Sequence, residues 1–388
     1  EQIKETKENP IFLPGFNLPN LIYPTNSLEE AIGENNVILI VVPTYYPASK
    51  FGGPIFQIHY LSKFLTNNKI RVTVCTTDKG NKKNVKSDVK EIVDGVEVFY
   101  FKRLFPKFYF SISMFLFLLR NIKKYELVHI HSIFNFPTAI ALIFSAIFKK
   151  KIILSPRGIL DRELIENKNT ILKKLWLYLF KKILSQKVKI FHATTELEKK
   201  KIEFYYKNSN IEVISNGIDT NYFLKEQNNH TLNSEYIKYF NKKTNLLYLG
   251  RIDRKKNIEL IIKSISKAKL SNFNLNIVGS GDSQYLEFLY NLCNELHLSN
   301  NINFINHLDG ESKIYFYKNS SHLLLPSKSE NFANVVLESI FFGKPVLISD
   351  KVGLKDFVRN NNFGVICDSK TTFEKELKYL IESNNIIS

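Results

Sequence analysis

The sequence predicts an α/β protein with two doubly wound parallel sheets. Short β-branched runs alternate with helical stretches from residue 37 to about residue 195, and the alternation returns after residue 243. Strands that alternate with helices form parallel sheets with helices on both faces. A chain of 388 residues is long enough to bury two separate hydrophobic cores. These observations favour two domains over one.

The alternation divides the chain into four segments. Residues 1–36 are an N-terminal extension, and residues 37–223 form the first domain. Residues 224–243 are rich in Asn and Lys, which is typical of a linker or surface segment. Residues 244–388 form the second domain, whose last helix is expected to pack back on the first. Because open parallel sheets bind ligands at the carboxyl ends of their strands, we expect the domains to face a central cleft.

The first domain begins with "VILIVV" at residues 37–42, whose continuous β-branched character is that of a strand buried on both faces. A loop rich in Pro, Gly and Tyr follows, and residues 55–68 then show helical spacing. Further strands are predicted at 70–77, 96–101, 127–133, 151–156 and 189–195, and helices at 111–124 and 171–184.

The second domain shows the same pattern of short apolar runs and helical spacing. Strands are predicted at 245–250, 273–279, 301–306, 322–327, 345–350 and 363–368. Helices are predicted at 257–269, near 283–296 and from about residue 334.

The net charge of +17 is concentrated in one part of the chain. Residues 101–200 hold 20 Lys and Arg against 6 Asp and Glu, a net charge of +14. A basic surface beside apolar helices indicates an anionic partner, either nucleic acid or lipid headgroups, whereas solvated lysines are the simpler alternative. The longest apolar run, residues 108–119, is shorter than the roughly 20 residues that cross a bilayer, so it could lie on a membrane but not span one.

Composition and missing motifs exclude several classes of protein. The three cysteines, Cys75, Cys293 and Cys367, form no C-x-x-C pair, which argues against a zinc site or a disulfide framework and favours the cytoplasm. Residues 1–36 lack the layout of a signal peptide. The chain has no G-x-G-x-x-G and no P-loop pattern. It also has no D-x-D triplet to hold a metal ion against a diphosphate, so we expect no metal and no other cofactor.

Two segments could bind a phosphate or a sugar. Arg251 and Lys256 in "LGRIDRKKNIELI" lie between a predicted strand and a predicted helix, where cations can reach an anion held at the helix N-terminus. A solvated basic turn is the alternative. Gly52 and Gly53 in "FGGP" follow the first strand, and glycine lets a backbone approach a ligand closely. A tight turn would explain these glycines without a ligand. The segment "GSGDS" after residue 278 is a comparable loop after a strand and has the same two interpretations.

Histidine and arginine occupy the ends of two strands in the first domain. His129 and His131 in "LVHIHSIF" lie on one face of a strand, and Arg157 in "SPRGIL" ends another. A lone histidine is more often a packing residue, which is the interpretation of His129. His131 lies at the carboxyl end of its strand, where a ligand would bind, and is a candidate catalytic residue.

Two glutamates are eight positions apart in "SENFANVVLES", Glu330 in a polar stretch and Glu338 in a helical one. On a continuous helix their side chains would diverge by about 80°. They can therefore serve one ligand only if the helix begins between them.

These segments together resemble the family 4 retaining glycosyltransferases, which have the GT-B fold of two Rossmann-like domains facing a central cleft. The resemblance runs from residue 37 to the end of the chain. "ENFANVVLE" looks like the family's E-x7-E motif, "PSKSENF" and "FFGKPVLISD" flank it as in the family, and "GRIDRKK" resembles its donor-phosphate motif. "VISNGIDTNYF", residues 213–223, is similar to the segment that closes the family's first domain.

The resemblance implies transfer of a sugar from a nucleotide diphosphate sugar to a glycan or lipid-linked glycan. It implies that Glu330 faces the donor sugar and that Glu338 accepts hydrogen bonds from the ribose hydroxyls, a role that suits a carboxylate because it is acceptor-only. The donor would also contact the backbone of three residues between the glutamates: Asn331, Phe332 and Ala333.

The catalytic set implied in this way is His131, Glu330, Arg251 and Lys256. Arg157 in "PRG" resembles a subset that builds bacterial surface polysaccharides and is assigned to the acceptor. The family often has Gly where Ala333 stands, and the added methyl group narrows the approach of the donor. Two other functions stay open: a GT-B-like nucleotide-sugar epimerase, and a non-enzymatic basic protein that binds nucleic acid, although we expect no nucleic-acid partner.

Residues 171–184, "ILKKLWLYLFKKIL", predict a helix at a membrane surface. Lys173–Lys174 and Lys181–Lys182 return to one broad side of the helix. The apolar side is predicted to contain Leu172, Trp176, Leu179, Phe180 and Ile183. A core helix with solvated lysines is the alternative. We therefore expect a cytoplasmic protein that associates with the inner face of the cytoplasmic membrane.

Overall fold

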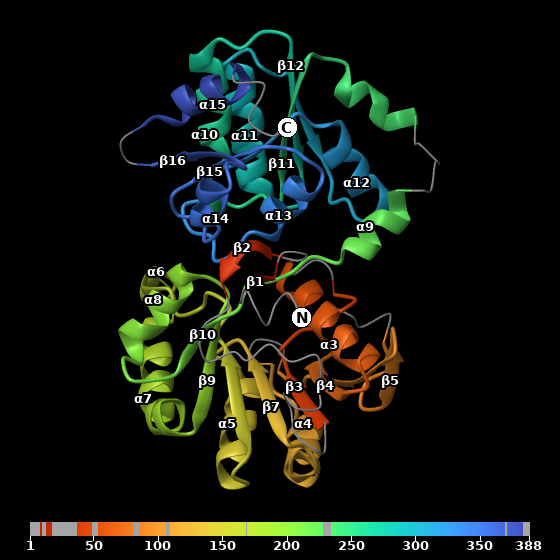
Figure 1. Cartoon of the computed structure of the whole chain (residues 1–388), viewed down its shortest axis with the longest axis vertical. Helices are drawn as coiled ribbons and strands as arrows, with labels where there is room; N and C mark the ends of the chain where they lie inside the picture. The colour runs from red at the N-terminus through yellow and green to blue at the C-terminus, as the bar shows by residue number, and fades with distance from the viewer. Residues whose placement is uncertain are drawn as a thin grey trace. The chain divides into compact units, whose positions relative to one another are not determined.

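The computed structural model describes residues 8–9, 13–17, 37–48, 53–80, 85–105, 109–167, 169–227, 234–368 and 371–382. The chain forms two compact units, Glu1–Gly217 and Ile218–Ser388, each with its own sheet flanked by helices (Figure 1). The predicted fold class, two doubly wound α/β domains, is therefore confirmed. The boundary between the units lies before residue 223, the predicted end of the first domain.

The first unit contains an eight-stranded sheet in the order β10-β9-β8-β7-β3-β4-β6-β5. The strands are β3 (Val37–Val41), β4 (Arg71–Thr77), β5 (Lys90–Val93), β6 (Val96–Phe101), β7 (Leu127–His131), β8 (Lys151–Ser155), β9 (Val188–Ala193) and β10 (Ile211–Val213). All neighbours are parallel except β5 and β6, and β5 is an edge strand that the sequence did not predict. Within the predicted extension 1–36, β1 (Glu8–Asn9) pairs with β2 (Leu13–Asn17).

Helices cover both faces of this sheet. They are α3 (Gly53–Asn67), α4 (Ile112–Asn121), α5 (Phe136–Ile147), α6 (Arg162–Asn167), α7 (Thr170–Gln186) and α8 (Glu196–Tyr205), with the 3₁₀ turn η2 (Ile122–Lys124) after α4. Three of them begin where side chains cap them: Ser111 accepts a hydrogen bond from the Met114 amide, Asn135 accepts one from the Thr138 amide at 2.9 Å, and Thr195 accepts one from the Glu198 amide at 3.1 Å. Serine and asparagine are preferred at this position because they satisfy amides that have no partner in the helix.

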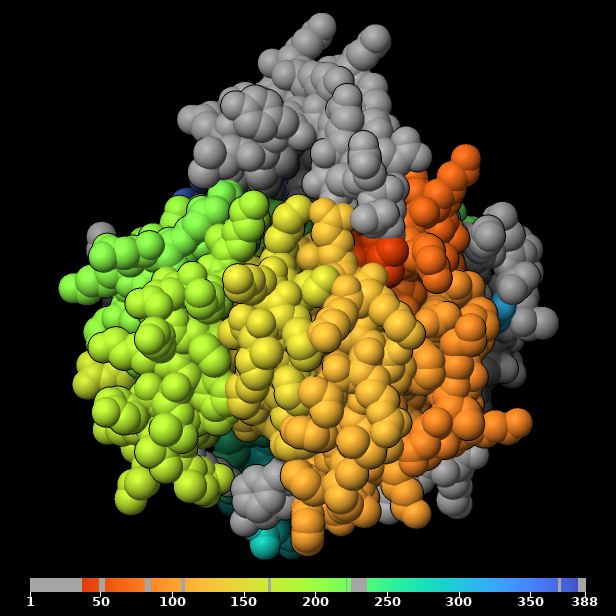
Figure 2. Space-filling view, turned by 90° about the horizontal axis from the view of Figure 1, so that it is seen from below, coloured from red at the N-terminus to blue at the C-terminus, as the bar shows by residue number. Residues whose placement is uncertain are grey.

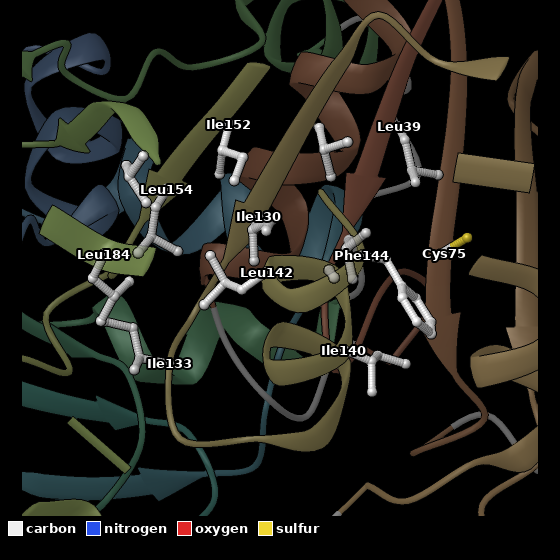
Figure 3. Close-up of a cluster of buried hydrophobic side chains, with 14 of the residues drawn as sticks. Leu39, Cys75, Ile130, Ile133, Ile140, Leu142, Phe144, Ile152, Leu154 and Leu184 are labelled. Atoms are coloured by element: carbon white, nitrogen blue, oxygen red, sulfur yellow. The ribbon is translucent and has the colours of Figure 1, made fainter. Parts of the chain in front are cut away.

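The two faces of the sheet bury alternate residues of each strand. In β3, Leu39 and Val41 belong to one hydrophobic cluster, whereas Ile38 and Ile40 belong to another, because successive side chains of a strand point to opposite faces. Residues of α4, α5, α7 and α8 complete the Leu39 cluster, and α3 completes the Ile38 cluster. Figure 3 shows part of the first cluster, in which strand residues such as Ile130 lie beside α5.

The second unit contains a six-stranded, all-parallel sheet in the order β13-β12-β11-β14-β15-β16. The strands are β11 (Thr244–Leu249), β12 (Phe273–Val278), β13 (Ile302–Ile305), β14 (His322–Leu325), β15 (Val346–Ser349) and β16 (Gly364–Cys367). Each coincides with a run predicted from the sequence.

The helices of the second unit connect these strands. They are α9 (Thr220–Gln227), η3 (Ser234–Phe240), η4 (Arg254–Lys256), α10 (Ile258–Ala268), α11 (Ser283–Glu295), α12 (Gly310–Asn319), α13 (Asn334–Phe341), α14 (Lys355–Asn360) and α15 (Phe373–Glu382). In α10, Ile258, Ile261, Ile262 and Ile265 are fully buried at helical spacing, which is why this segment forms an amphipathic helix on the sheet.

Two segments near the predicted boundaries pack within the second unit. The described part of segment 224–243 includes η3, whose rings pack on α12: Phe240 lies 5.0 Å from the Phe316 ring and Tyr236 lies 5.5 Å from it. This aromatic packing makes η3 a surface segment of the second unit. The last described helix, α15, buries Phe373, Leu377 and Leu380 and packs on α10 and β16 of the second unit.

The membrane-helix prediction is right about the helix and wrong about its apolar side. The helix α7 forms as expected, but Trp176, Phe180 and Ile183 pack on the core of the first unit. The indole of Trp176 stacks on Phe180 at 4.3 Å and meets Phe134 at 5.4 Å. Trp176 is therefore half-buried against the core and does not lie on the exposed side of the helix. None of the helices within the described residues is long and apolar enough to cross a membrane.

Candidate active site

Loops at the carboxyl end of the second sheet lie in direct backbone contact. A Cβ atom on Gly279, after β12, would lie 1.9 Å from the carbonyl oxygen of Gly250, after β11. A Cβ on Gly281 would meet the Ile252 oxygen at the same distance. Glycine is needed in "GSGDS" because the two loops touch. The contact holds the Arg251 loop in place.

Arg251 and Lys256 lie on the predicted strand-to-helix loop and have different environments. The Arg251 side chain is exposed, and its carbonyl oxygen accepts a hydrogen bond from the Tyr248 hydroxyl at 2.7 Å. The turn η4 is capped by Asp253, which accepts a hydrogen bond from the Lys255 amide at 2.9 Å. Lys256 ends this turn, is 17% exposed, and forms an ion pair with Glu330.

Glu330 lies before α13, on a segment fixed by backbone hydrogen bonds. Its amide donates to the Lys351 oxygen at 3.1 Å, and its own oxygen accepts from the Gly353 amide at 3.0 Å. These bonds join the loop after β14 to the loop after β15. The Glu330 carboxylate accepts a hydrogen bond from the Lys256 ammonium group, so two predicted site residues far apart in sequence meet here.

The turn between the two glutamates is centred on Ala333. Its backbone is left-handed, with φ 72° and ψ 71°, and α13 begins at the next residue. The prediction that a helix begins between Glu330 and Glu338 is therefore confirmed. A non-glycine residue in this region costs on the order of 1 kcal/mol, which explains why glycine also suits the position. Ala333 has no polar side chain that could cap α13.

Glu338 lies within α13 and is held by two residues of α12. Tyr317 donates a hydrogen bond to Oε2 of Glu338 at 2.6 Å, and the Lys313 ammonium group lies 2.7 Å from the same oxygen. Burial, and secondarily the Glu338 charge, raises the pKa of Tyr317 well above its usual value, so Tyr317 stays a hydrogen-bond donor. Both of these contacts are made to Oε2 of the carboxylate. The sequence prediction missed Lys313 and Tyr317, although their i, i+4 spacing places them on one side of a helix.

In the first unit, polar side chains line one face of three neighbouring strands. The strand register places His129 and His131 of β7 on the same face as Ser155 of β8. The Ser155 hydroxyl lies 2.8 Å from Nε2 of His129 and 2.8 Å from Nδ1 of His192, which β9 contributes. This network confirms His129 as a satisfied packing residue. His192 is part of it and was not predicted.

His131 and Arg157 meet at the carboxyl ends of β7 and β8. The Arg157 Nε donates to Nδ1 of His131 at 3.3 Å, and its Nη1 donates to Asn216 at 2.8 Å. An arginine is only a donor, so Nδ1 must accept, and the ring proton of neutral His131 lies on Nε2. Nε2 is buried and has no hydrogen-bond partner among the described residues. It is therefore a donor available to a ligand.

Glu198 fixes the backbone beside Arg157. Its carboxylate accepts hydrogen bonds from the Gly158 amide at 2.6 Å and from the Thr194 amide at 2.8 Å. Arg157 has a left-handed backbone, with φ 58°, which these bonds help to hold. The sequence prediction missed Glu198, although Thr195 and Glu198 form the S/T-x-x-E pattern of a capping box at the start of α8.

Burial keeps the histidines of this network neutral. Burial is the main cause that lowers the pKa of His129 and His131 well below the usual value, and it lowers the pKa of His192 to about 4. Arg157 adds a smaller effect of the same sign, and burial lowers its own pKa only to about 10, so it stays charged at neutral pH. Neutral His131 can donate or accept a hydrogen bond but cannot supply positive charge.

These shifts predict that acid destabilises the protein. The folded pKa values of His129 and His131 lie below the unfolded value of about 6.5, so the unfolded chain binds more protons as the pH falls below 6.5. Each residue should then lower the free energy of unfolding by up to about 1.4 kcal/mol per pH unit. Urea unfolding between about pH 7 and pH 4.5 measures the slope. H131Q should reduce the slope of the unfolding free energy against pH by up to the contribution of one proton. An unchanged slope would show that the pKa of His131 is not lowered in the folded protein.

The remaining predicted residues are placed as follows. Gly52 lies outside the described residues, and Gly53 is the first residue of α3. Asn331 is half-buried and Phe332 is buried, both in the turn before α13. Among the described residues, no group of three or more His, Cys, Asp or Glu side chains could hold a metal ion. The two clusters belong to different units.

Comparison with known proteins agrees with this architecture. The family model for glycosyl transferases group 1 matches residues 229–386, and that for glycosyltransferase family 4 matches residues 51–222. A model for the N-terminus of NAD-dependent glycerol-3-phosphate dehydrogenase also matches residues 1–95, where the sequence has no G-x-G-x-x-G.

Individual proteins are similar over part or most of the chain. An uncharacterized glycosyltransferase of Methanocaldococcus jannaschii is 31% identical over 121 residues, which is 31% of this chain and 30% of that protein. The capsular polysaccharide biosynthesis glycosyltransferase CapM of Staphylococcus aureus is 30% identical over 156 residues, 40% of each chain. The crystal structure of Anabaena HepE in complex with UDP-glucose has a TM-score of 0.68 and 15% identity, covering 90% of this chain and 91% of that one.

Two Rossmann-like units, each matched by a glycosyltransferase family model, define a glycosyltransferase of the GT-B fold. The first unit is matched by the model for glycosyltransferase family 4, the family that the sequence motifs resemble.

Proposed function

We propose that the enzyme transfers a sugar, with retention of configuration, from a nucleotide diphosphate sugar to a glycan or lipid-linked glycan. The observation that carries this proposal is the ion pair between Lys256 and Glu330 at the turn that leads to Glu338. This ion pair supports a donor site in which Lys256 lies beside the Glu330 carboxylate, the group proposed to face the sugar. HepE, of similar fold, was crystallised with UDP-glucose, and CapM acts in capsular polysaccharide biosynthesis, which favours these classes of donor and acceptor.

The residues of the second unit have separate roles in this proposal. Arg251 and Lys256 stabilise the negative charge that develops on the departing diphosphate, which preorganised donors do efficiently. Glu338 accepts hydrogen bonds from the ribose hydroxyls through Oε1, while Lys313 and Tyr317 hold Oε2. Glu330 and the backbone from Asn331 to Ala333 contact the sugar.

The residues of the first unit serve the sugar and the acceptor. The Nε2 proton of His131 is placed to donate a hydrogen bond to a sugar hydroxyl, because that atom is buried and unpaired among the described residues. Arg157 keeps its charge and contacts the acceptor. Gly52 and Gly53 would let the backbone approach the donor. We place the enzyme in the cytoplasm, associated with the inner face of the cytoplasmic membrane.

Transfer in this proposal requires no metal ion. The chain has no D-x-D triplet, and cations at Arg251 and Lys256 are available for the charge that a metal would neutralise. An epimerase of the same fold remains the alternative, and it would release free sugar and nucleotide products without an acceptor.

A panel of UDP-, GDP- and ADP-sugars tests the function. The correct donor at 100 times its Kd should stabilise the folded protein by about 2.7 kcal/mol, measured as a rise in thermal midpoint. Release of nucleoside diphosphate should then depend on an added glycan acceptor and persist in EDTA. Stabilisation by no donor would contradict the proposal, product formation without acceptor would favour the epimerase, and loss of turnover in EDTA that Mg²⁺ or Mn²⁺ restores would refute metal independence.

A further inference from the structure

One side of α7 is apolar, and no described residue covers it. Five of its side chains are 49% to 82% exposed, although they are as large as core residues: Ile171, Leu172, Leu175, Tyr178 and Leu179. They lie on the side of the helix opposite Leu184, which is fully buried in the core. A helix on the surface of a monomer would normally carry polar residues there.

The neighbouring helices extend this apolar surface. Helix α4 contacts α5, and α5 contacts α7, so the three form one layer on the same face of the first sheet. Figure 2 shows the orange, yellow and lime parts of the chain, which include these helices, side by side on one side of the molecule. Exposed apolar side chains on the other two helices are Ile112, Phe115, Leu116 and Leu119 of α4 and Ile143 and Ile147 of α5.

Cations gather along the amino edge of the same sheet. In a parallel sheet, every turn from a helix into the next strand lies at this edge, opposite the edge where ligands bind. The turns 68–71, 122–127, 148–151, 186–189 and 206–211 hold ten Lys and Arg residues and a single acid, Glu126. Glu126 is paired with Lys151 at 2.9 Å. The edge is therefore strongly positive.

A cavity opens on this basic edge. It has a volume of about 780 Å³ and is lined by Lys69, Arg71 and Lys124 together with aromatic rings such as Phe117 and Tyr125. Cations around an apolar lining suit a group that is both anionic and amphipathic.

We propose that α4, α5, α7 and the amino-edge turns form a surface, the basic apolar face, that binds an anionic lipid bilayer. Lysines attract the headgroups, and the exposed leucine and isoleucine side chains enter the boundary of the acyl chains. The inference identifies the surface behind the membrane association in the proposed function and rests on that proposal for its biological role.

Charge and chemistry distinguish a bilayer from other occupants. A nucleic acid would use the cations but gives aliphatic side chains little to pack against, because its surface is a phosphate backbone. A second copy related by two-fold symmetry would bring the same cations together, which opposes association. An anionic bilayer complements both the charge and the apolar side chains.

Co-sedimentation of the full chain with vesicles tests this surface. Vesicles of phosphatidylglycerol and phosphatidylcholine should retain the protein at about 0.05 M salt and release most of it at about 0.5 M, because salt screens exposed charges. Vesicles of phosphatidylcholine alone should retain little. Equal retention by both kinds of vesicle would overturn the proposal.

Two sets of variants separate the charges from the apolar side chains. The variant K149Q/K187Q/K189Q should weaken partitioning by about fivefold per lysine, on the order of a hundredfold in all. Its matched control, K263Q/K267Q/K269Q on and after α10 of the second unit, should bind like the wild type. L175Q/L179Q should also lose binding, whereas the control F64Q/I237Q, on α3 and η3, should not. Circular dichroism checks that each variant is folded.

The same variants reveal the other occupants. Oligonucleotide binding that is lost in K149Q/K187Q/K189Q, with vesicle binding absent, would replace the bilayer with nucleic acid. A dimer in sedimentation that L175Q/L179Q dissolves, again without vesicle binding, would make the face a self-association surface. A protein that turns over a nucleotide sugar but ignores vesicles would overturn this inference alone. Vesicle binding without any donor turnover would overturn the proposed function alone.

Discussion

Replacing Lys256 or Arg251 with alanine is expected to lower kcat/KM by at least tenfold while leaving the fold intact. Each side chain would lose a charge-assisted contact with the departing diphosphate, worth about 1.5–3 kcal/mol. Arg251 is exposed and Lys256 lies at the end of a 3₁₀ turn, so neither change creates a core cavity. Steady-state kinetics with the donor that stabilises the protein measures the effect.

Lys255 provides the matched control for this experiment. It precedes Lys256, is exposed, and contributes its backbone to the turn through the Asp253 cap and a bond from the Lys328 amide at 2.8 Å. K255A therefore removes one charge from the same loop and should change kcat/KM little. Equal losses in K255A and K256A would indicate a general effect of charge rather than a specific phosphate contact.

A double-mutant cycle separates two roles of Lys256. If Lys256 acts only by holding Glu330, then K256A/E330Q should be as active as E330Q alone, because the partner is already lost. If it also binds the diphosphate, the double variant should lose a further tenfold or more. Unchanged kinetics in both R251A and K256A would remove the phosphate assignment.

The sequence was sufficient for the fold and for the local structure around the two glutamates. Buried parallel strands are rich in β-branched residues over their whole length, as in residues 37–42. This signal lies within the strand's own sequence, so it can be read without knowledge of the tertiary contacts. The start of α13 between Glu330 and Glu338 was also predictable, because a polar stretch gives way to helical spacing within a few residues. The predicted strands of both sheets were found at these positions.

Contacts between distant segments were not predictable in the same way. Lys313 and Tyr317 reach Glu338 because α12 packs beside α13, and nothing near Glu338 in the sequence indicates this. His192 joins His129 through Ser155 only because β7, β8 and β9 are neighbours in the sheet. A strand order must be known before such contacts can be predicted.

The orientation of α7 was mispredicted for a related reason. Apolar residues occur around most of its circumference, so periodicity alone could not decide which side meets the sheet. The stacking of Trp176 on Phe180 and its contact with Phe134 decide it. Leu172 and Leu179 remain exposed as predicted, but their apolar neighbours are Ile171, Leu175 and Tyr178.

The glutamates are expected to differ in kinetics although both are assigned to the proposed donor site. E330Q should lower kcat more than it raises KM, because Glu330 is proposed to act beside the reacting sugar, where its charge matters most in the transition state. The substitution preserves the side-chain size and leaves the backbone bonds to Lys351 and Gly353 in place. Initial rates over a range of donor concentrations separate the two constants.

E338Q should instead weaken donor binding with a smaller effect on kcat. Glutamine keeps one acceptor oxygen but places an amide donor near Tyr317, Lys313 or the ribose, each of which already supplies donors. Y317F should reproduce part of the loss in affinity, since it removes one of the two contacts that hold Oε2. E287Q, on the exposed side of α11, is the control that removes a carboxylate elsewhere in the same unit. If E330Q and E338Q both change only KM, Glu330 is a binding residue and its catalytic assignment is wrong.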